Sequence, residues 1–263
     1  MLTNTRSDRV KAVRALSRRA VRSRQGLFLA EGPQSVREAV SHRPDVVREL
    51  YATAEARARH TPILATAADA GLAVQEVSDE VLAEMCDTEA PQGLLAVCRV
   101  LTSSLEAVLE RRPRLLCVLM NVRDPGNAGT VLRGADAAGA DAVVLSENSV
   151  DVFAPKVVRS TAGSLFHLPV VTGVPVDEIL RQVRAAGLAL LAADGAGKHL
   201  LGDVDLVRAH AWILGNEAWG LDDVVLARCD DVVRVPVHGR AESLNLAMAA
   251  TLCLYASARA QRG

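Results

Sequence analysis

Three segments in the second half of the chain are rich in Asn, Gly, Arg, Glu and Ser, residues that bind and orient polar ligands: NVRDPGNAGTVLRG (121–134), GNEAWGL (215–221) and VPVHGRAESLNL (235–246). Each follows an apolar run that is typical of a buried strand. In open α/β sheets, ligands bind outside the carboxyl ends of the strands, where such loops lie. Three loops of this kind in one half of the chain predict a convergent polar site, whose chemistry the residues alone leave open.

Several of these side chains are also candidates for ordinary helix capping. Asn127 is expected to cap the helix that follows the first of these strands, with Arg133 about two turns further along it. Ser243 is expected to cap the last helix of the chain, with Glu242 beside it. Capping and ligand binding are compatible, so these positions remain site candidates.

Three familiar site motifs are absent. DGAGKHL (194–200) contains Gly-Lys, but His199 stands where a P-loop has Ser or Thr, and the glycine spacing is wrong. Residues 125–134 lack G-x-G-x-x-G, and no G-x-S-x-G turn surrounds Ser243. The five cysteines form no C-x-x-C pair and the six histidines form no H-E-x-x-H pattern, so neither a disulfide framework nor a metal site is predicted.

The elements that must position the loops follow from apolar runs and helix-start residues. In the first half, strands are expected at 27–30, 47–52, 72–77 and 93–100, with helices from Pro33 and Ser78. A connecting helix starts at Ser103 or Ser104. In the second half, strands are expected at 115–120, 142–145, 168–171, 188–193, 211–214 and 232–237, with helices at 127–138 and from Pro155, Pro175, Asp222 and Ser243. Apolar strands that alternate with helices predict an α/β fold with a parallel sheet covered on both faces.

Composition bounds the class of protein. The 263 residues correspond to one large domain or two modest ones, and half of them are apolar, which excludes global disorder. No apolar run reaches the roughly 18 residues of a membrane helix, and no signal peptide is present, so a soluble cytoplasmic protein is expected. Residues 1–25 contain eight Arg or Lys residues against one acid, Asp8, although the whole chain has a net charge of −1. Such a basic arm suits a polyanionic partner, and it is equally consistent with a solvated amphipathic helix.

The final segment LNLAMAATLCLYA (244–256) is apolar nearly all round. A terminal helix without a polar face must be buried, so a subunit interface is expected there.

Taken together, the polar segments resemble the three motifs of the SpoU/TrmH family of RNA ribose 2′-O-methyltransferases, within the SPOUT superfamily. The first motif corresponds to NVRDPGNAGTVLRGADAAGADAVVL (121–145) with FAPKVVRSTAGSLFHLPV (153–170), the second to ILGNEAWGL (213–221) and the third to VPVHGRAESLNLAMAA (235–250). LAEGPQSVREA (29–39) and APQGLLAVC (90–98) resemble an L30e-like substrate-binding domain. The resemblance implies a basic N-terminal arm (1–25), an L30e-like RNA-binding domain (26–100), a linker helix (101–113) and a SPOUT methyltransferase domain (114–263).

What the resemblance implies for the fold is a parallel sheet whose C-terminal segment forms a deep trefoil knot, in a homodimer that uses the C-terminal helix and the knot region. It implies that S-adenosylmethionine is the cofactor, held largely through backbone groups. Carried over to this chain, the cofactor-binding residues are Leu214, Gly215, Asn216, Gly220, Val235, Pro236, Ser243 and Leu244. No metal and no membrane partner are implied.

The reaction implied is attack of a ribose 2′-oxygen on the methyl group of the cofactor, with rRNA, most of all 23S rRNA, as the expected substrate and tRNA as the other possibility. Arg133 matches the catalytic arginine, and because a guanidinium stays protonated, we expect it to grip phosphate and stabilise the developing alkoxide. Asn127 is expected to orient Arg133 or the RNA. Glu217 is expected to hold the site together or to contact substrate. The alternative is that it only forms a salt bridge within its loop. Ser243 and Asn245 are expected to position the cofactor end or the 2′-oxygen.

Removal of residues 1–25 is expected to weaken RNA binding. Alternatives remain open. A SPOUT enzyme that methylates a ring nitrogen would lack the Asn127, Arg133, Ser243 and Asn245 set. A non-catalytic RNA-binding assembly factor would not bind the cofactor, and a small-molecule methyltransferase would not need the basic arm.

Overall fold

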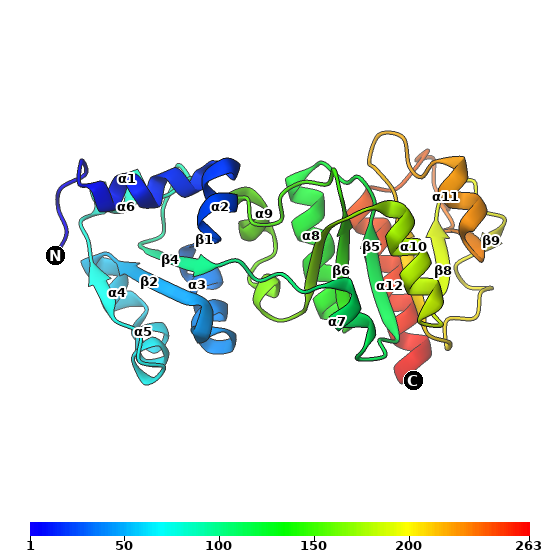
Figure 1. Ribbon diagram of the computed structural model, residues 1–263, viewed down its shortest axis with the longest axis horizontal. Coiled ribbons are helices and arrows are strands. Elements are labelled where there is room, and N and C mark those ends of the chain that lie inside the picture. The colour runs from blue at the N-terminus through cyan, green and yellow to red at the C-terminus, as the bar shows by residue number, and fades with distance from the viewer. The chain divides into compact units, whose positions relative to one another are not determined.

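The computed structural model describes all residues 1–263, which form two compact units (Figure 1). Unit 1 contains Met1–Leu101 and Asp151–His167, and unit 2 contains Thr102–Val150 and Leu168–Gly263. Residues 151–167 thus pack with unit 1, although the sequence pattern assigns them to the C-terminal domain. The reason is aromatic packing: Phe153 and Phe166 pack against Phe28 of the first strand, with ring centroids 5.0 and 6.1 Å away.

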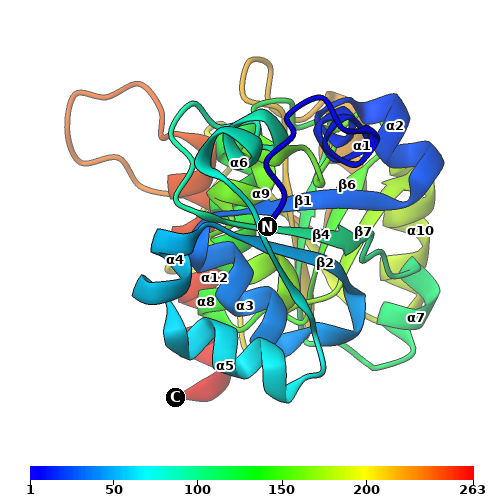
Figure 2. The same cartoon turned by 90° about the vertical axis from the view of Figure 1, so that its left-hand side faces the viewer.

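Unit 1 is built on a four-stranded sheet in the order β1-β4-β2-β3. The strands are β1 (Leu27–Glu31), β4 (Leu94–Arg99), β2 (Val47–Ala52) and β3 (Val74–Glu76); only β2 and β3 are parallel. Figure 2 shows α1 (Asp8–Arg14) and α6 (Asp79–Met85) on one face, and α3 (Gly32–His42), α4 (Ala54–Arg59) and α5 (Thr61–Asp69) on the other. The expected strands are confirmed, whereas α4 and α5 were not expected.

The basic N-terminal segment is part of this unit. It forms α1, a short 3-10 turn (Ala15–Ser17) and α2 (Arg19–Gln25), and it buries Val10, Val13 and Leu16 in the core. Arg22 is itself buried, donating to the carbonyls of Leu16 and Ser17 and pairing with Asp151 at 2.6 Å. The segment is therefore not a free arm. Its deletion would remove part of a hydrophobic core, so deletion cannot measure the contribution of its charges to RNA binding.

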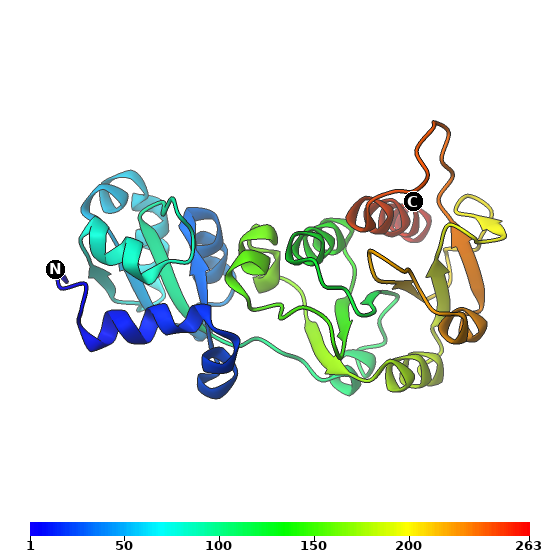
Figure 3. The same ribbon diagram turned by 90° about the horizontal axis from the view of Figure 1, so that it is seen from above.

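Unit 2 is built on a seven-stranded parallel sheet in the order β7-β6-β5-β10-β8-β11-β9. Its strands are β5 (Leu115–Leu119), β6 (Ala142–Ser146), β7 (Val170–Val174), β8 (Ala189–Ala193), β9 (His199–Leu200), β10 (His210–Leu214) and β11 (Asp231–Arg234). Figure 3 shows α8 (Pro125–Ala138) and α12 (Leu246–Arg262) on one face, with α7 (Leu105–Leu109), α10 (Val176–Ala185) and α11 (Asp223–Arg228) on the other. In unit 1, α9 (Pro155–Ser160) packs against β1. The predicted parallel α/β fold is confirmed; the knot stays a prediction.

Two expected helix caps are wrong by two or three residues. The helix α8 is capped by Asp124, whose carboxylate accepts from the backbone N–H of Asn127 at 2.7 Å. Pro125 occupies the first helical position, where it needs no N–H partner, so the cap falls on the preceding residue. The helix α12 is capped by Asn245 instead of Ser243. Consequently Asn127 and Ser243 keep their side chains free of capping.

The apolar C-terminal helix is only partly buried. It packs against α8 and the sheet and buries Ala247, Ala250 and Leu254, while Met248, Leu252 and Tyr255 are exposed. No helix of the structure is long and apolar enough to cross a lipid bilayer.

Candidate active site

The first two polar loops meet because the strands before them are neighbours. β5 and β10 are parallel and in register, with Leu119 opposite Leu214, so the residues that follow emerge at the same edge of the sheet. Asn216, which is 6% exposed, donates its Nδ2 to the carbonyl of Asn121 at 2.6 Å. Asn121 has φ +54°, a left-handed conformation that turns the chain away from the strand. These contacts fix the two loops against each other.

Glu217 connects the second loop to the start of α8. Its carboxylate accepts hydrogen bonds from the backbone N–H groups of Arg123 and Asp124, at 3.3 and 3.1 Å, and from Asn127 Nδ2 at 3.4 Å. Glu217 forms no salt bridge, so the alternative that it only forms a salt bridge within its loop is wrong. Glu217 therefore holds the loop after β5 and the loop after β10 in one arrangement.

The third loop joins this network through Asn245. The Oδ1 atom of Asn245 caps α12, which leaves Nδ2 to donate to Asn127 Oδ1 at 2.9 Å. Asn127 Oδ1 thus faces Asn245 and its Nδ2 faces Glu217, so the network defines the orientation of both amides. Residues 118 positions apart in the chain are brought into direct contact. The predicted convergence of the three loops is confirmed.

Arg133 is not part of this network. It lies six residues after Asn127 on α8, which at 3.6 residues per turn places it on a different side of the helix. Its side chain is exposed and forms no hydrogen bond or ion pair. The neighbouring Gly134 packs on α12, since a Cβ there would lie 2.8 Å from Thr251 Oγ1. Arg133 therefore projects to solvent beside the contact between α8 and α12.

A cavity of about 370 Å³ opens beside the network, at the ends of β8, β10 and β11. Its size is in the range of small-molecule sites. Of the eight residues expected to bind a cofactor, all except Pro236 line it: Leu214, Gly215, Asn216, Gly220, Val235, Ser243 and Leu244. The site candidates Glu217 and Glu242 also line it. The structure thus places Ser243 in the cavity wall.

Backbone packing shapes the wall of this cavity. Asn216 and Gly220 exchange two backbone hydrogen bonds, at 3.0 and 2.9 Å, which fold the second loop back on itself. A Cβ on Gly215 would lie 2.3 Å from the carbonyl carbon of Gly220. Only glycine fits at position 215, because the obstructing atoms are backbone.

Asp194 and Gly195 are among the lining residues that the sequence did not indicate as site candidates. They follow β8, whose neighbour in the sheet is β10, so the same strand-end rule applies to them. The signal was present in DGAG (194–197), a segment that matched no phosphate-binding motif. The charged side chains that line the cavity are three acids, Asp194, Glu217 and Glu242, and one base, Arg234. The lining is therefore acidic.

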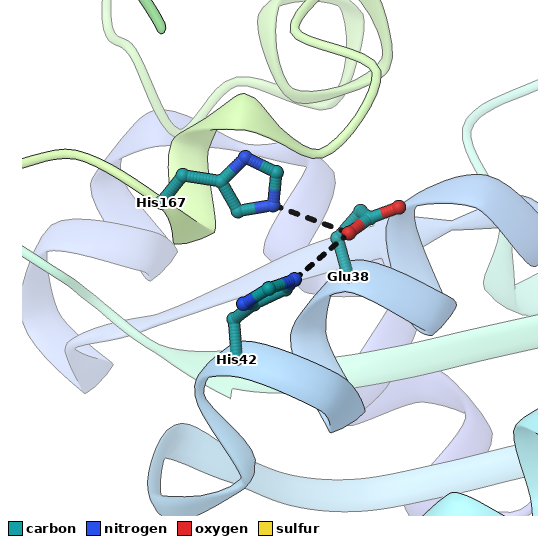
Figure 4. Close-up of side chains that lie close together, drawn as sticks. All are labelled: Glu38, His42 and His167. Atoms are coloured by element: carbon teal, nitrogen blue, oxygen red, sulfur yellow. Dashed lines mark hydrogen bonds and ion pairs between the residues drawn. The ribbon is translucent and has the colours of Figure 1, made fainter. Parts of the chain in front are cut away.

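The structure also gathers a cluster in unit 1 that sequence spacing does not indicate (Figure 4). Glu38 Oε2 lies 3.3 Å from His42 Nε2 and 3.2 Å from His167 Nε2, and Glu38 Oε1 accepts from Arg37. Burial alone would raise the pKa of Glu38, but the hydrogen bonds from Arg37 and His167 outweigh it and lower the pKa. The cluster is a charge-assisted hydrogen-bond network that ties α3 to the turn at Ser164–Phe166.

Sequence comparison identifies the class. The SpoU rRNA Methylase family matches residues 114–255, and the MRM3-like substrate binding domain matches residues 7–96. The chain belongs to the SpoU rRNA methylase family. The second match begins at residue 7, in agreement with the packing of α1 and α2 into unit 1.

Individual relatives span nearly the whole chain. The chain is 34% identical to the 23S rRNA (guanosine(2553)-2'-O)-methyltransferase RlmP of Bacillus subtilis, over 97% of both proteins. The AdoMet-bound rRNA methyltransferase of Sinorhizobium meliloti has a TM-score of 0.84 at 29% identity, covering 98% of this chain and 97% of that one. The SpoU methyltransferase AviRb of Streptomyces viridochromogenes in complex with AdoMet has a TM-score of 0.83 at 32% identity, covering 96% and 98%.

Proposed function

We propose that this protein transfers a methyl group from S-adenosylmethionine to a ribose 2′-hydroxyl of 23S rRNA. The observation that carries the proposal is the meeting of three polar loops beside a ligand-sized cavity, in a chain of the SpoU family. Incubation of the protein with labelled S-adenosylmethionine and separate 23S rRNA, 16S rRNA and tRNA pools tests it. Label in the 23S pool is expected. Label confined to tRNA would change the substrate, and absence of cofactor binding would favour a non-catalytic RNA-binding protein.

The cavity suits this cofactor. Its acidic side chains, Asp194, Glu217 and Glu242, complement a positively charged sulfonium and amino group. Its apolar side chains, which include Leu214, Val235 and Leu246, suit an adenine ring. Bound S-adenosylmethionine supplies the electrophilic methyl group. Ser243 lines the cavity and Asn245 belongs to the three-loop network, and we place the 2′-oxygen between them.

The side chains of this chain must position and activate a weak nucleophile. A ribose hydroxyl stays protonated near neutral pH, so the site must orient it and stabilise the negative charge that develops on it. Arg133 supplies that stabilisation by donating to the adjacent phosphate and the developing alkoxide. Glu217 and Asn127 keep the loops in place for this step through the hydrogen bonds described above.

Arg133 lies apart from the hydrogen-bond network of its own chain, and we place it instead at the site of the partner in a homodimer. Met248, Leu252 and Tyr255 are 61, 47 and 50% exposed and recur at helical spacing along one side of α12. This apolar stripe is the surface on which a second copy docks, because such stripes on a helix are buried in stable proteins. Since Arg133 lies beside the packing contact of α8 and α12, docking buries it and brings it to the partner's site.

Substitution Leu252→Glu is expected to convert the dimer to a monomer and to reduce methyl transfer, because it places a charge in the apolar stripe. Light scattering coupled to gel filtration measures the mass. Val224→Glu is the matched control, since Val224 is also an exposed apolar residue of unit 2, 68% accessible, but lies on α11, on the opposite face of the sheet from α12. A Leu252→Glu protein with the same mass as the wild type would exclude this interface.

The contribution of unit 1 charges to RNA binding can be tested by substituting arginines, without deleting residues 1–25. Arg18, Arg19 and Arg24 are exposed and form no side-chain ion pair. Replacing all three by Gln is expected to reduce the slope of log Kd against log salt by about two, because each lost phosphate contact contributes roughly 0.7–0.9. The matched control replaces Arg43, Arg57 and Arg59, which are each paired with an acid. Equal slopes in both triple variants would remove the RNA-binding role of this segment.

A further inference from the structure

Unit 1 contains a cavity of its own, of about 250 Å³. It is formed by the two segments that define the expected substrate-binding domain and by α9, and no role assigned above uses it. The lining residues are Glu31, Gly32, Gln34, Ser35, Cys86, Thr88, Ala90, Pro91, Gln92, Leu94, Arg159 and Ala162. The cavity is therefore a place where three separate segments of the chain meet.

A buried carboxylate holds these segments together. The side chain of Glu31 is only 2% exposed. It accepts from the backbone N–H groups of Asp87 and Thr88, at 2.8 and 3.3 Å, and from Arg159 Nη1 at 2.8 Å. Arg159 also pairs with Asp87 at 3.2 Å. These hydrogen bonds and ion pairs join the three segments that form the walls of the cavity.

Polar side chains that line this cavity are available to a ligand. Ser35 lines it, and no other group of the chain uses its hydroxyl as a hydrogen-bond partner. Because the cavity is open, this hydroxyl can both donate to and accept from a ligand there. The side-chain amide of Gln92 is also unpaired, and it lies over the start of α3, since a Cβ on Gly32 would be 3.2 Å from Gln92 Oε1. A hydroxyl and an amide, each both donor and acceptor, thus face the cavity.

Apolar groups of Leu94, Pro91 and Ala90 form part of the remaining lining, together with the polar side chains of Gln34 and Thr88. A cavity with apolar walls and hydrogen-bonding groups suits a flat heterocycle with donors and acceptors on its edge. At 250 Å³ it is smaller than the usual site of a drug-sized ligand and takes a single ring system. Lys156, exposed and unpaired, lies one helical turn from Arg159 on α9, where it can contact a phosphate outside the cavity. A free anion is disfavoured inside, because Glu31 and Asp87 already neutralise Arg159.

We infer that this cavity is a subsite for one unpaired nucleobase of the RNA substrate. RNA is read with sequence specificity mainly through unstacked bases that a protein accepts into a pocket and hydrogen-bonds along their edges. The inference rests on the proposed function for the identity of the RNA. It assigns to unit 1 the recognition of one extruded base.

The test compares substitutions at Gln92 and Ser35 in the full-length protein. Gln92→Trp places an indole in the mouth of the cavity and is expected to raise the KM for 23S rRNA roughly tenfold, the scale of losing one bound base. Gln92→Ala and Ser35→Ala each remove one hydrogen-bonding group and are expected to raise KM roughly three- to tenfold. In all three, kcat and the affinity for S-adenosylmethionine are expected to be unchanged. Gln25→Trp and Gln25→Ala, at an exposed glutamine of unit 1 outside the cavity, are the controls.

Unchanged KM in both Gln92 variants, with unchanged thermal unfolding, would overturn the inference. The same variants are compared for 23S rRNA affinity by filter binding, which does not depend on methyl transfer. If the wild-type protein binds rRNA but transfers no methyl group, the proposed reaction fails while the binding data still decide on the subsite. If transfer proceeds and the variants bind like the wild type, only the subsite fails.

Discussion

Arg133→Ala is expected to lower kcat for methyl transfer by about 100- to 1000-fold, the usual effect of removing one group that stabilises transition-state charge. The affinity for S-adenosylmethionine is expected to stay within a few-fold of the wild type, because Arg133 does not line the cofactor cavity. Folding is expected to be unaffected, since the side chain is exposed and forms no contact that the fold requires. Single-turnover methyl transfer and calorimetric cofactor binding measure the two quantities separately.

The control for Arg133 is Arg111→Ala. Arg111 is also exposed and unpaired in unit 2, but it precedes β5 and so lies at the opposite edge of the sheet from the site. Arg133→Lys adds a second test, because lysine keeps the charge but loses the planar fork that binds phosphate in two places. It is expected to retain only part of the activity. Near-normal turnover in Arg133→Ala would contradict the assignment of Arg133 as the charge-stabilising group.

Gly215→Ala is expected to weaken S-adenosylmethionine binding roughly 100-fold, the scale of a severe packing conflict. The added methyl group would lie 2.3 Å from a backbone carbon of Gly220, and the loop at 215–221 cannot keep its two internal backbone hydrogen bonds while it moves away. The cavity wall formed by this loop would therefore be displaced. Isothermal titration with S-adenosylmethionine measures the effect.

Gly195→Ala provides a matched control for Gly215. Gly195 lines the same cavity, but a Cβ there meets nothing within 4 Å. The same chemical change is thus made twice in one site, once against backbone and once into open space. Near-normal affinity in Gly195→Ala and a large loss in Gly215→Ala are expected. Equal affinities in both variants would mean that the cavity does not hold the cofactor.

The strands and their parallel arrangement could be predicted because buried strands have short, continuous apolar sequences. LLCVL (115–119) and AWIL (211–214) are such runs, and both lie at the centre of the seven-stranded sheet. The strand-end rule then placed the three polar loops at one edge without any coordinates. That rule depends on topology alone, which explains why it succeeded where the finer assignments did not.

The details that failed depend on choices between chemically similar residues. Asp124, Asn127, Ser243 and Asn245 are all good helix caps, and only the fold shows that Asp124 and Asn245 take that role. This choice matters for the site, because the cap made by Asn245 Oδ1 directs its Nδ2 to Asn127. Sequence spacing cannot report a contact across 118 residues.

Which segments belong to unit 1 also depends on long-range contacts, and these could not be predicted from the sequence. Phe153 and Phe166 look like ordinary core residues of the second domain, and only their stacking on Phe28 shows that 151–167 belongs with the first. The basic segment 1–25 was recognised by its charge, but the apolar positions Val10, Val13 and Leu16 were the signal that it packs as a pair of helices.

The most direct test of the central claim is the position of the transferred methyl group. 23S rRNA is methylated in vitro by the wild-type protein with labelled S-adenosylmethionine, digested to nucleosides and separated by liquid chromatography with mass detection. We expect a single labelled nucleoside that carries its methyl group on the ribose, and labelling of the same nucleoside slowed by about 100-fold or more when Arg133→Ala replaces the wild type. Label on a base would contradict the account, because the site formed by Asn127, Glu217, Asn245 and Arg133 would then serve a different reaction.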